Sequence, residues 1–476
     1  MFLRLAFSTT LLGLFLSAVP VPCSAAQLSD VEHIIVIYLE NHSFDNLFGF
    51  FPNADGIAAA GATKIQVDAS GHPYTFLPPV ERLVKKPDGT KVSEIDPRFP
   101  GNLPNQPFSI DAFVPIGEPT GDLLHRYYDQ IEQIDGGRMD KFAAYSDARG
   151  LAIGFYDGSQ TKLWDYAKRY TLADHFFHAA FGGSLLNHFW FICACTPRYE
   201  GLPPDAITAK FDVNSHISQL GQKGVIRTDL ITPDRYVVNT IFPQFGPHPE
   251  NPPPPFDNFL PPIDSKRVPT IGSRLSDKNI SWAWYSGGWD DAVAGQASKD
   301  FQFHHQPFAY FDNYKELMSQ RHLLDARDFI WDIVHDTLPQ VVFYKPIGEL
   351  NEHPEYANVL AGDDHLDRVL RLIEQSKLWP KSIVVVTFDE NGGYWDHVPP
   401  PKIDQWGPGV RVPTVIISPF AKKGFIDHTT YDTTSILKLI EVRFGLEPLG
   451  NRDKNSKDLT AAFDFTSPEK EAGAKP

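Results

Sequence analysis

The stretch SIVVVTFDENGGYWDHV, residues 382–398, decides the fold. Residues 383–386 form an uninterrupted β-branched apolar run, which is typical of a strand buried on both faces inside a parallel α/β sheet. The run ends abruptly in Asp389 and Glu390, and a Gly-Gly pair soon after permits a sharp turn. Ligands of open α/β sheets bind at the carboxyl ends of strands, so two adjacent carboxylates here predict a metal or phosphate site.

The same arrangement occurs near the start of the chain. Residues 33–39, HIIVIYL, form a second apolar run that Glu40 and Asn41 follow directly. Two buried strands that each end in an acid can bring hard oxygen ligands together around one cation. Zinc or manganese could be held by Glu40, Asn41, Asp389 and Glu390, but a set made only of oxygen ligands favours a harder ion.

Composition limits the possible partners. The chain has 476 residues, of which 42% are hydrophobic, and a formal net charge of -16. This length is enough for one large α/β domain with insertions or for two domains. The acidic balance argues against a groove for nucleic acid or for an anionic membrane. A small anionic substrate stays possible, because a metal ion and clustered histidines can reverse the local field.

Residues 1–26 have the features of a secretory signal in the required order: Arg4, an apolar run that reaches Val19, and small residues at 24–26. The apolar run is short for a membrane span. We therefore expect a periplasmic or secreted protein without stable membrane insertion. The alternative is that residues 1–26 form a hydrophobic first helix of the fold.

Alternating strand and helix patterns predict a doubly wound α/β domain over residues 27–450. Two stretches rich in Pro and Gly, at about 52–120 and 196–270, interrupt it, and we expect them to form a cap over the site. Residues 122–142 are predicted to be helical with a break at Gly136-Gly137, and His125 lies on the first turn. Residues 451–476 are expected to be a frayed polar tail.

The stretch FGGSLLNHFWFICAC, residues 181–195, places Ser184 between a Gly-Gly pair and an apolar helical pattern. A hydroxyl at a helix start lies beside free backbone N–H groups that can hold an anion. Gly-Gly-Ser turns are also common structural features. A serine needs a metal or a base to act as a nucleophile at neutral pH, which the acids could provide. Cys193 and Cys195 are expected to be buried thiols, because cysteines two apart rarely satisfy disulfide geometry.

These motifs resemble a known family. The stretches HIIVIYLENHSFDNLFG, FGGSLLNHFWF, FHHQPFAYF, LNEHPEYA, VVVTFDENGGYWDHV and DTTSILKLIE, in this order between about residues 33 and 445, are similar to those of the bacterial acid phosphatase and phospholipase C family. The resemblance implies an alkaline-phosphatase-like fold with a central, mostly parallel sheet flanked by helices. It implies one divalent metal ion on Glu40, Asn41, Asp389 and Glu390, and Ser184 as the covalent phosphate acceptor.

The resemblance also assigns roles to several histidines. It suggests that His305 and His353 are catalytic and that His125, His304 and Asn41 bind substrate. We expect His304, His305 and His353 to be largely protonated at about pH 5.5, so that activity on small monoesters peaks at about pH 5 to 6.5. Five other histidines are expected to be structural: His33, His175, His178, His188 and His428. A supporting role at the metal site is left open for His397.

Ser184 within GGSLLNH looks more like the acid phosphatase branch, because the phospholipase branch typically has a threonine there. We therefore expect a phosphomonoesterase that hydrolyses small phosphorylated substrates through a phosphoseryl intermediate. One alternative is a phospholipase C acting on phospholipid head groups. Another is a non-catalytic envelope protein that binds a cation or phosphate, although such a binder would usually have lost the nucleophile or a metal ligand.

Overall fold

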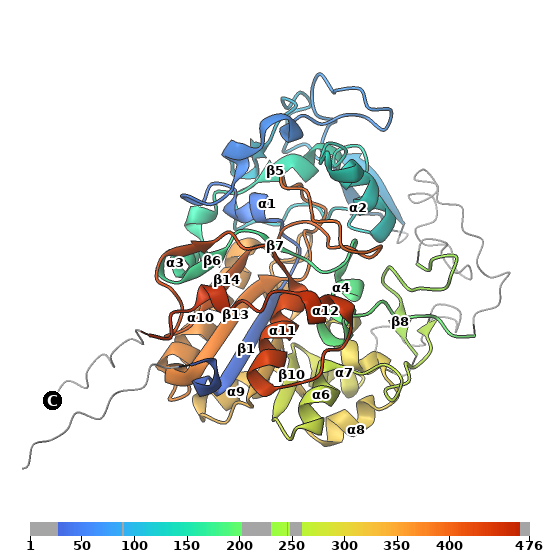
Figure 1. Cartoon of the computed structure of the whole chain (residues 1–476). Helices are drawn as coiled ribbons and strands as arrows, with labels where there is room; N and C mark the ends of the chain where they lie inside the picture. Colours follow the sequence, from blue (N-terminus) through green and yellow to red (C-terminus); the bar gives the residue numbers. More distant parts are fainter. Residues whose placement is uncertain (1–26, 88–89, 202–229, 245, 248–258, 467–476) are drawn as a thin grey trace, which may run out of the picture.

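The centre of the molecule is an eight-stranded sheet (Figure 1). The structure, a computed structural model, describes residues 27–87, 90–201, 230–244, 246–247 and 259–466. The sheet has the strand order β11-β10-β12-β1-β13-β14-β6-β15. Its strands are β1 His33–Leu39, β6 Thr171–Ala173, β10 Trp282–Ser286, β11 Leu323–Asp325, β12 Val341–Lys345, β13 Ser382–Phe388, β14 Thr414–Ile417 and β15 Phe425–Asp427.

The two strands that the sequence singled out lie side by side in the middle of this sheet. β1 and β13 are parallel, and Leu39 pairs with Phe388 at their carboxyl ends. All seven residues of β13 are buried, as the apolar run predicted. The other strands are parallel to this pair except β14, which runs antiparallel to both β13 and β6. The residues that follow β1 and β13 therefore emerge together at one edge.

Helices cover both faces of the sheet. One group comprises α3 Lys162–Arg169, α9 Ala326–Val334 and α10 Val359–Gln375, and the other comprises α4 Ser184–Cys193, α6 Ile271–Asp277 and α11 Thr433–Phe444. The side chain of Asp432 caps α11, and Gly445 ends it in a left-handed conformation. The predicted α/β class, with a mostly parallel sheet flanked by helices, is confirmed.

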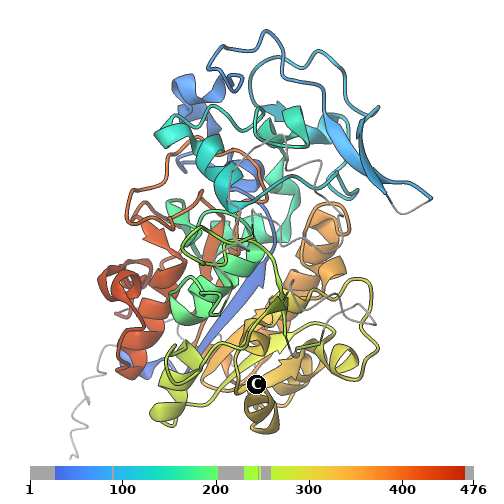
Figure 2. The same cartoon turned by 90° about the vertical axis from the view of Figure 1, so that its right-hand side faces the viewer.

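The smaller elements lie mainly in the connections. The short helices are α1 Phe44–Phe48, α2 Tyr127–Ile134, α7 Trp289–Val293, α8 Tyr314–Ser319 and α12 Asn451–Asn455. The paired short strands are β2 Glu81–Lys85 with β3 Lys91–Ile95, β4 Phe108–Ser109 with β5 Gly154–Phe155, β7 Phe176–Phe177 with β16 Tyr431–Asp432, and β8 Phe242–Pro243 with β9 Phe259–Leu260. The first predicted insertion lies beyond the carboxyl end of β1, and its β2–β3 hairpin projects outward (Figure 2).

The helix predicted over residues 122–142 is too long. Residues 122–126 precede α2, and Arg126 has an extended backbone. The N–H of Leu124 is bound instead by the Asp147 carboxylate at 2.7 Å, which holds this segment outside a helix. His125 consequently lies before the helix rather than on its first turn.

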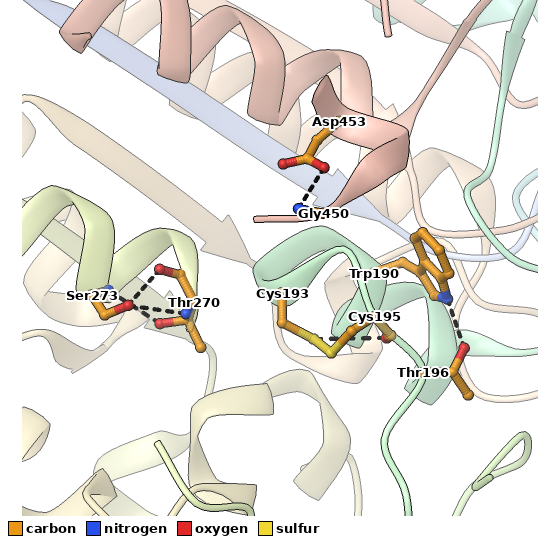
Figure 3. Close-up of a disulfide and its surroundings, with 8 residues drawn as sticks. All are labelled: Trp190, Cys193, Cys195, Thr196, Thr270, Ser273, Gly450 and Asp453. Carbon is orange, nitrogen blue, oxygen red and sulfur yellow. Dashed lines mark hydrogen bonds between the residues drawn. A yellow bond between two sulfur atoms is a disulfide. The ribbon is translucent and has the colours of Figure 1, made fainter. Parts of the chain in front are cut away.

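The chain end is also more ordered than predicted. Within residues 451–466, Asp453 and Leu459 are fully buried. The Asp453 carboxylate accepts the N–H of Gly450 at 2.8 Å (Figure 3). The expectation of a frayed tail from residue 451 is therefore wrong for residues 451–466, and the rest of the tail, like the predicted signal, lies outside the described residues. Across the described part of the chain, none of the helices combines the length and apolarity needed to span a bilayer.

Cys193 and Cys195 form a disulfide at the end of α4 (Figure 3). The expectation of two buried thiols is therefore wrong. It was based on the two-residue spacing, whereas Ala194 between them has a left-handed backbone with φ 47°. This turn brings the two Cα atoms to 5.1 Å, which is within reach of a disulfide.

Candidate active site

Three neighbouring strands deliver charged side chains to one point. Glu40 directly follows β1, Asp389 directly follows β13, and Lys345 is the last residue of β12, on the other side of β1. The N–H of Asp389 donates to the carbonyl of Leu39 at 3.0 Å, which holds the ends of the two strands in register. All three charged side chains are fully buried.

The amide of Asn41 lies at the centre of the acids. One of its terminal atoms lies 2.9 Å from Glu40 Oε2, 3.2 Å from Asp389 Oδ1 and 2.9 Å from Glu390 Oε1. The other terminal atom lies 2.8 Å from His353 Nε2. The orientation of this amide therefore decides whether the acids face a donor or a fourth oxygen.

The hydrogen bonds of His353 bear on that orientation. Its Nδ1 lies 2.6 Å from the carbonyl of Pro354, and because a carbonyl only accepts, Nδ1 carries the proton. A proton on Nδ1 leaves Nε2 able to accept a hydrogen bond from the Asn41 NH₂ group. The amide oxygen is left facing three carboxylate oxygens, which is unfavourable unless a cation lies among them. Four converging oxygens fit a hard divalent ion.

The electrostatics of the acids lead to the same conclusion. Burial, together with the nearby carboxylates, raises the pKa values of Asp389 and Glu390 well above their ordinary range. Burial also acts to raise the pKa of Glu40, but Lys345 and His305 outweigh it and hold that pKa well below its ordinary value. A bound cation would favour the ionised form of every acid. The buried acidic cluster therefore suits a metal ion.

Ser184 is the first residue of α4 and its side chain reaches the acids. The hydroxyl donates to Glu40 Oε2 at 3.3 Å. The preceding glycines permit this close approach: Gly182 has φ 89°, and a Cβ there would lie 2.5 Å from the backbone nitrogen of Tyr127. The structure thus brings the predicted nucleophile to the predicted metal ligands.

The predicted histidines surround the same point. His305 Nε2 lies 2.8 Å from Glu40 Oε1, and His125 Nε2 lies 3.5 Å from Glu390 Oε1. His353 contacts Asn41, as described above. His304 is one step further away, with its ring centroid 4.7 Å from that of His305.

The predicted protonation of His304 and His305 does not hold. Burial lowers the pKa of His305 to about 4 and lowers the pKa of His304 well below its ordinary value. Burial likewise lowers the pKa of His125. The expectation that His304 and His305 carry charge at pH 5 to 6.5 is therefore wrong, because desolvation disfavours the charged ring.

Sequence reasoning missed two residues at the site. His188 was expected to be structural, yet its Nδ1 lies 2.7 Å from the carbonyl of Ser184 and 3.9 Å from Asp389 Oδ2. Its position four residues after Ser184 on a helix could have indicated this, because residues at that spacing share a face. Lys345, whose Nζ lies 2.5 Å from Glu40 Oε1, ends an apolar strand and carried no such signal.

A second buried cluster lies apart from these acids. His397 Nδ1 lies 2.7 Å from Asp45 and its Nε2 lies 3.1 Å from Asp55. Arg411 already supplies the cation here, with Nε 2.8 Å from Asp396 and a terminal nitrogen 3.2 Å from Asp45. The question left open for His397 is answered by these contacts, which tie it to an ion-pair network rather than to the four converging oxygens.

Comparison with known proteins identifies the family. The model of the Phosphoesterase family matches residues 31–447. This chain belongs to the Phosphoesterase family. It is therefore a hydrolase that acts on phosphoric ester bonds, as the sequence resemblance implied.

Relatives of this phosphoesterase span most of its length. Phospholipase C B of Mycobacterium tuberculosis is 24% identical over 491 residues, covering 94% of this chain and 80% of that protein. Non-hemolytic phospholipase C of Pseudomonas aeruginosa is 24% identical over 501 residues, covering 95% of this chain and 60% of that protein. Similar solved structures include a protein in the alkaline phosphatase superfamily from Vibrio parahaemolyticus, with a TM-score of 0.33 and 9% identity, covering 64% of each chain.

Proposed function

We propose that this phosphoesterase is a phospholipase C, which cleaves the phosphodiester of a phospholipid between the glycerol and the phosphorylated head group. The relatives named phospholipase C carry this proposal, because they match 94–95% of this chain. The phosphomonoesterase that the sequence suggested first becomes the second candidate.

The charge of the site supports a diester substrate. A phosphodiester carries one negative charge, whereas a phosphate monoester carries up to two at neutral pH. Burial keeps His304 and His305 neutral, so these rings can donate or accept hydrogen bonds but add no positive charge. The ammonium of Lys345 is already paired with Glu40. Among the described residues, Lys345, His304 and His305 add no unpaired positive charge to that of a bound metal ion, which is better matched to a monoanion.

The residues suggest the following reaction. Ser184 Oγ, oriented by its hydrogen bond to Glu40 Oε2 at 3.3 Å, attacks phosphorus and its proton passes to solvent water. The P–O bond to glycerol breaks, and the diacylglycerol oxygen takes up a proton from solvent water. Water then hydrolyses the phosphoseryl ester, which releases the phosphorylated head group and restores Ser184.

A divalent ion held by Glu40, Asn41, Asp389 and Glu390 would favour the serine alkoxide and polarise the phosphoryl oxygens. We propose supporting roles for two histidines: His305 orients Glu40, and His353 orients the Asn41 amide. The side chain of His125 is 18% exposed, and we propose that it contacts substrate. His304 would support His305 through their ring contact.

Two further features of the proposal concern location and shape. The disulfide between Cys193 and Cys195, together with the signal predicted at residues 1–26, supports action outside the cytosol. We also propose that residues 52–120, beyond the carboxyl end of β1, form part of the head-group pocket.

One observation favours the second candidate. Residue 184 is a serine, whereas the phospholipases that the sequence resembles typically have a threonine at this point. The distinguishing experiment measures kcat/KM for phosphatidylcholine in mixed micelles and for p-nitrophenyl phosphate, with and without a chelator. Diacylglycerol release at the higher kcat/KM supports phospholipase C. Hydrolysis of p-nitrophenyl phosphate without diacylglycerol release supports the phosphomonoesterase, and metal binding without either reaction supports the non-catalytic binder.

A further inference from the structure

Lys345 is buried in an unusual position for a lysine. Its side chain is fully inaccessible at the end of β12. Its ammonium donates to the carbonyl of Leu39 at 3.1 Å and lies 2.5 Å from Glu40 Oε1. It also lies 3.9 Å from Asp389 Oδ2 and 5.0 Å from the centre of the Tyr38 ring. A buried ammonium needs such partners, because an isolated one would be strongly destabilising.

The two carboxylates that Lys345 approaches each have an inner and an outer oxygen. The inner oxygens, Glu40 Oε2 and Asp389 Oδ1, face the Asn41 amide. The outer oxygens, Glu40 Oε1 and Asp389 Oδ2, are those nearest to Lys345. Glu40 and Asp389 therefore bridge two positions, one with four converging oxygens and one that holds an ammonium group.

The outer position offers ligand atoms that could hold a second metal ion. Glu40, His188 and Asp389 offer ligand atoms that all lie within 4.8 Å of one another. Carboxylates that bridge two ions a few ångströms apart are the basis of two-metal phosphoesterase chemistry. Here the Lys345 ammonium lies against the same outer oxygens, so it already provides a positive charge there.

The charges are consistent with one ion. Glu40, Asp389 and Glu390 contribute three negative charges when ionised, and Lys345 contributes one positive charge. One divalent ion then balances the site, whereas two would leave a buried excess of positive charge, which is costly.

We propose that Lys345 replaces a second metal ion. It is a positioning residue: it holds Glu40 Oε1 so that Oε2 faces Ser184 and the inner position, and it restricts the site to one divalent ion. This inference rests on the proposed metal-assisted site but not on the identity of the substrate.

The test measures bound Mn²⁺ without any substrate, so it is independent of whether the enzyme cleaves phospholipids. Purified full-length protein is saturated with Mn²⁺, freed of excess metal and analysed for manganese per chain. We expect one ion in the wild type. Removing the ammonium in Lys345→Met should admit a second ion or tighten binding of the first at least about 10-fold at pH 8, while kcat falls at least about 10-fold.

Two further variants serve as controls for charge and for the loss of a lysine elsewhere. Lys345→Arg keeps the positive charge and should still bind one ion. Lys141→Met removes a lysine paired with Asp135, at 3.4 Å, away from the acids, and should match the wild type in both manganese and kcat. Two ions in the wild type would overturn the proposal even if Lys345→Met failed to fold. A folded Lys345→Met protein with one ion bound no more tightly than in the wild type would also overturn it.

Discussion

Asn41 is the residue that most constrains the chemistry of the site. A carbonyl oxygen of Pro354 fixes the proton on His353 Nδ1, His353 Nε2 then fixes the Asn41 amide, and the amide oxygen joins three carboxylate oxygens. Each step follows from hydrogen-bond donor and acceptor identity. A metal ion among these oxygens suits this hydrogen bonding as well as the buried acidic cluster.

Replacing one acid should remove the ion. In Asp389→Ala, the site loses a charged ligand and the hydrogen-bond acceptor of the Glu390 N–H, which it binds at 2.8 Å. We expect loss of bound metal together with a fall in kcat of at least about 100-fold. Elemental analysis and kinetics on one preparation measure both. Asp364→Ala, at an exposed position of α10, is the control, and full metal content in Asp389→Ala would refute the assignment.

The sequence indicated the acids and the serine because each stands at the end of a recognisable element. Glu40 and Asp389 follow apolar runs, and Ser184 follows a Gly-Gly pair. Lys345 also ends a strand, but its meaning depends on β12 lying next to β1, which no local pattern reveals. The pKa shifts of the histidines were beyond sequence analysis as well, because they depend on how deeply each ring is buried.

At the scale of elements, the prediction succeeded for regular strands and helices and failed where side chains replaced backbone hydrogen bonds. The Asp147 carboxylate holds Leu124 in an extended segment where a helix was predicted. The left-handed Ala194 closes the disulfide that spacing alone argued against. Both failures have a local cause that the hydrophobic periodicity of the sequence does not report.

The disulfide should stabilise the end of α4 modestly. It closes a very short loop, for which chain entropy predicts about 1.5 kcal/mol. We expect the double variant Cys193→Ser, Cys195→Ser to lose about this free energy of unfolding in urea titrations. The wild type under a strong reductant serves as the matched comparison and should lose a similar amount. No loss in either sample would mean that the bond does not form.

The network around His397 should make stability depend on pH. Burial opposes the charge on His397, but Asp45 and Asp396 outweigh it and raise its pKa to about 9. The unfolded value is about 6.5, so the folded state binds the proton more tightly. This contribution is fully present below about pH 6.5 and is lost as pH rises to about 9, by up to about 3 kcal/mol.

Urea unfolding at pH 6.5 and at pH 9 measures this effect. The difference in unfolding free energy between the wild type and His397→Gln should be larger at pH 6.5 than at pH 9. His335→Gln, an exposed histidine on the far end of α9, controls for general effects of the substitution. A difference that stays constant over this range would show that His397 is not held protonated by its neighbours.

For the whole molecule, the topology explains why distant sequence motifs form one site. Parallel strands β12, β1 and β13 end at the same edge, so residues from positions 40, 345 and 389 meet there. The acidic net charge of -16 does not oppose an anionic substrate, because the local field at this edge depends on the metal and on Lys345.

Metal binding should therefore stabilise the whole fold. A ligand that binds only the folded state at 100 times its Kd adds about 2.7 kcal/mol to the free energy of unfolding. We expect Mn²⁺ to raise the Tm of the chelator-treated wild type and to leave that of Asp389→Ala nearly unchanged. Differential scanning calorimetry measures both. An equal rise in the two proteins would place the ion elsewhere.

The central claim is that Ser184, activated at a metal-assisted site, forms a covalent phosphoryl intermediate. The most direct measurement is rapid acid quenching of the enzyme during turnover of p-nitrophenyl phosphorylcholine, followed by mass spectrometry of the peptide that contains residue 184. We expect a phosphorylcholine adduct on Ser184 in the wild type. We also expect that Ser184→Ala, folded and with its metal content retained, shows neither adduct nor turnover. Continued turnover by Ser184→Ala, or an adduct on another residue, would contradict this claim.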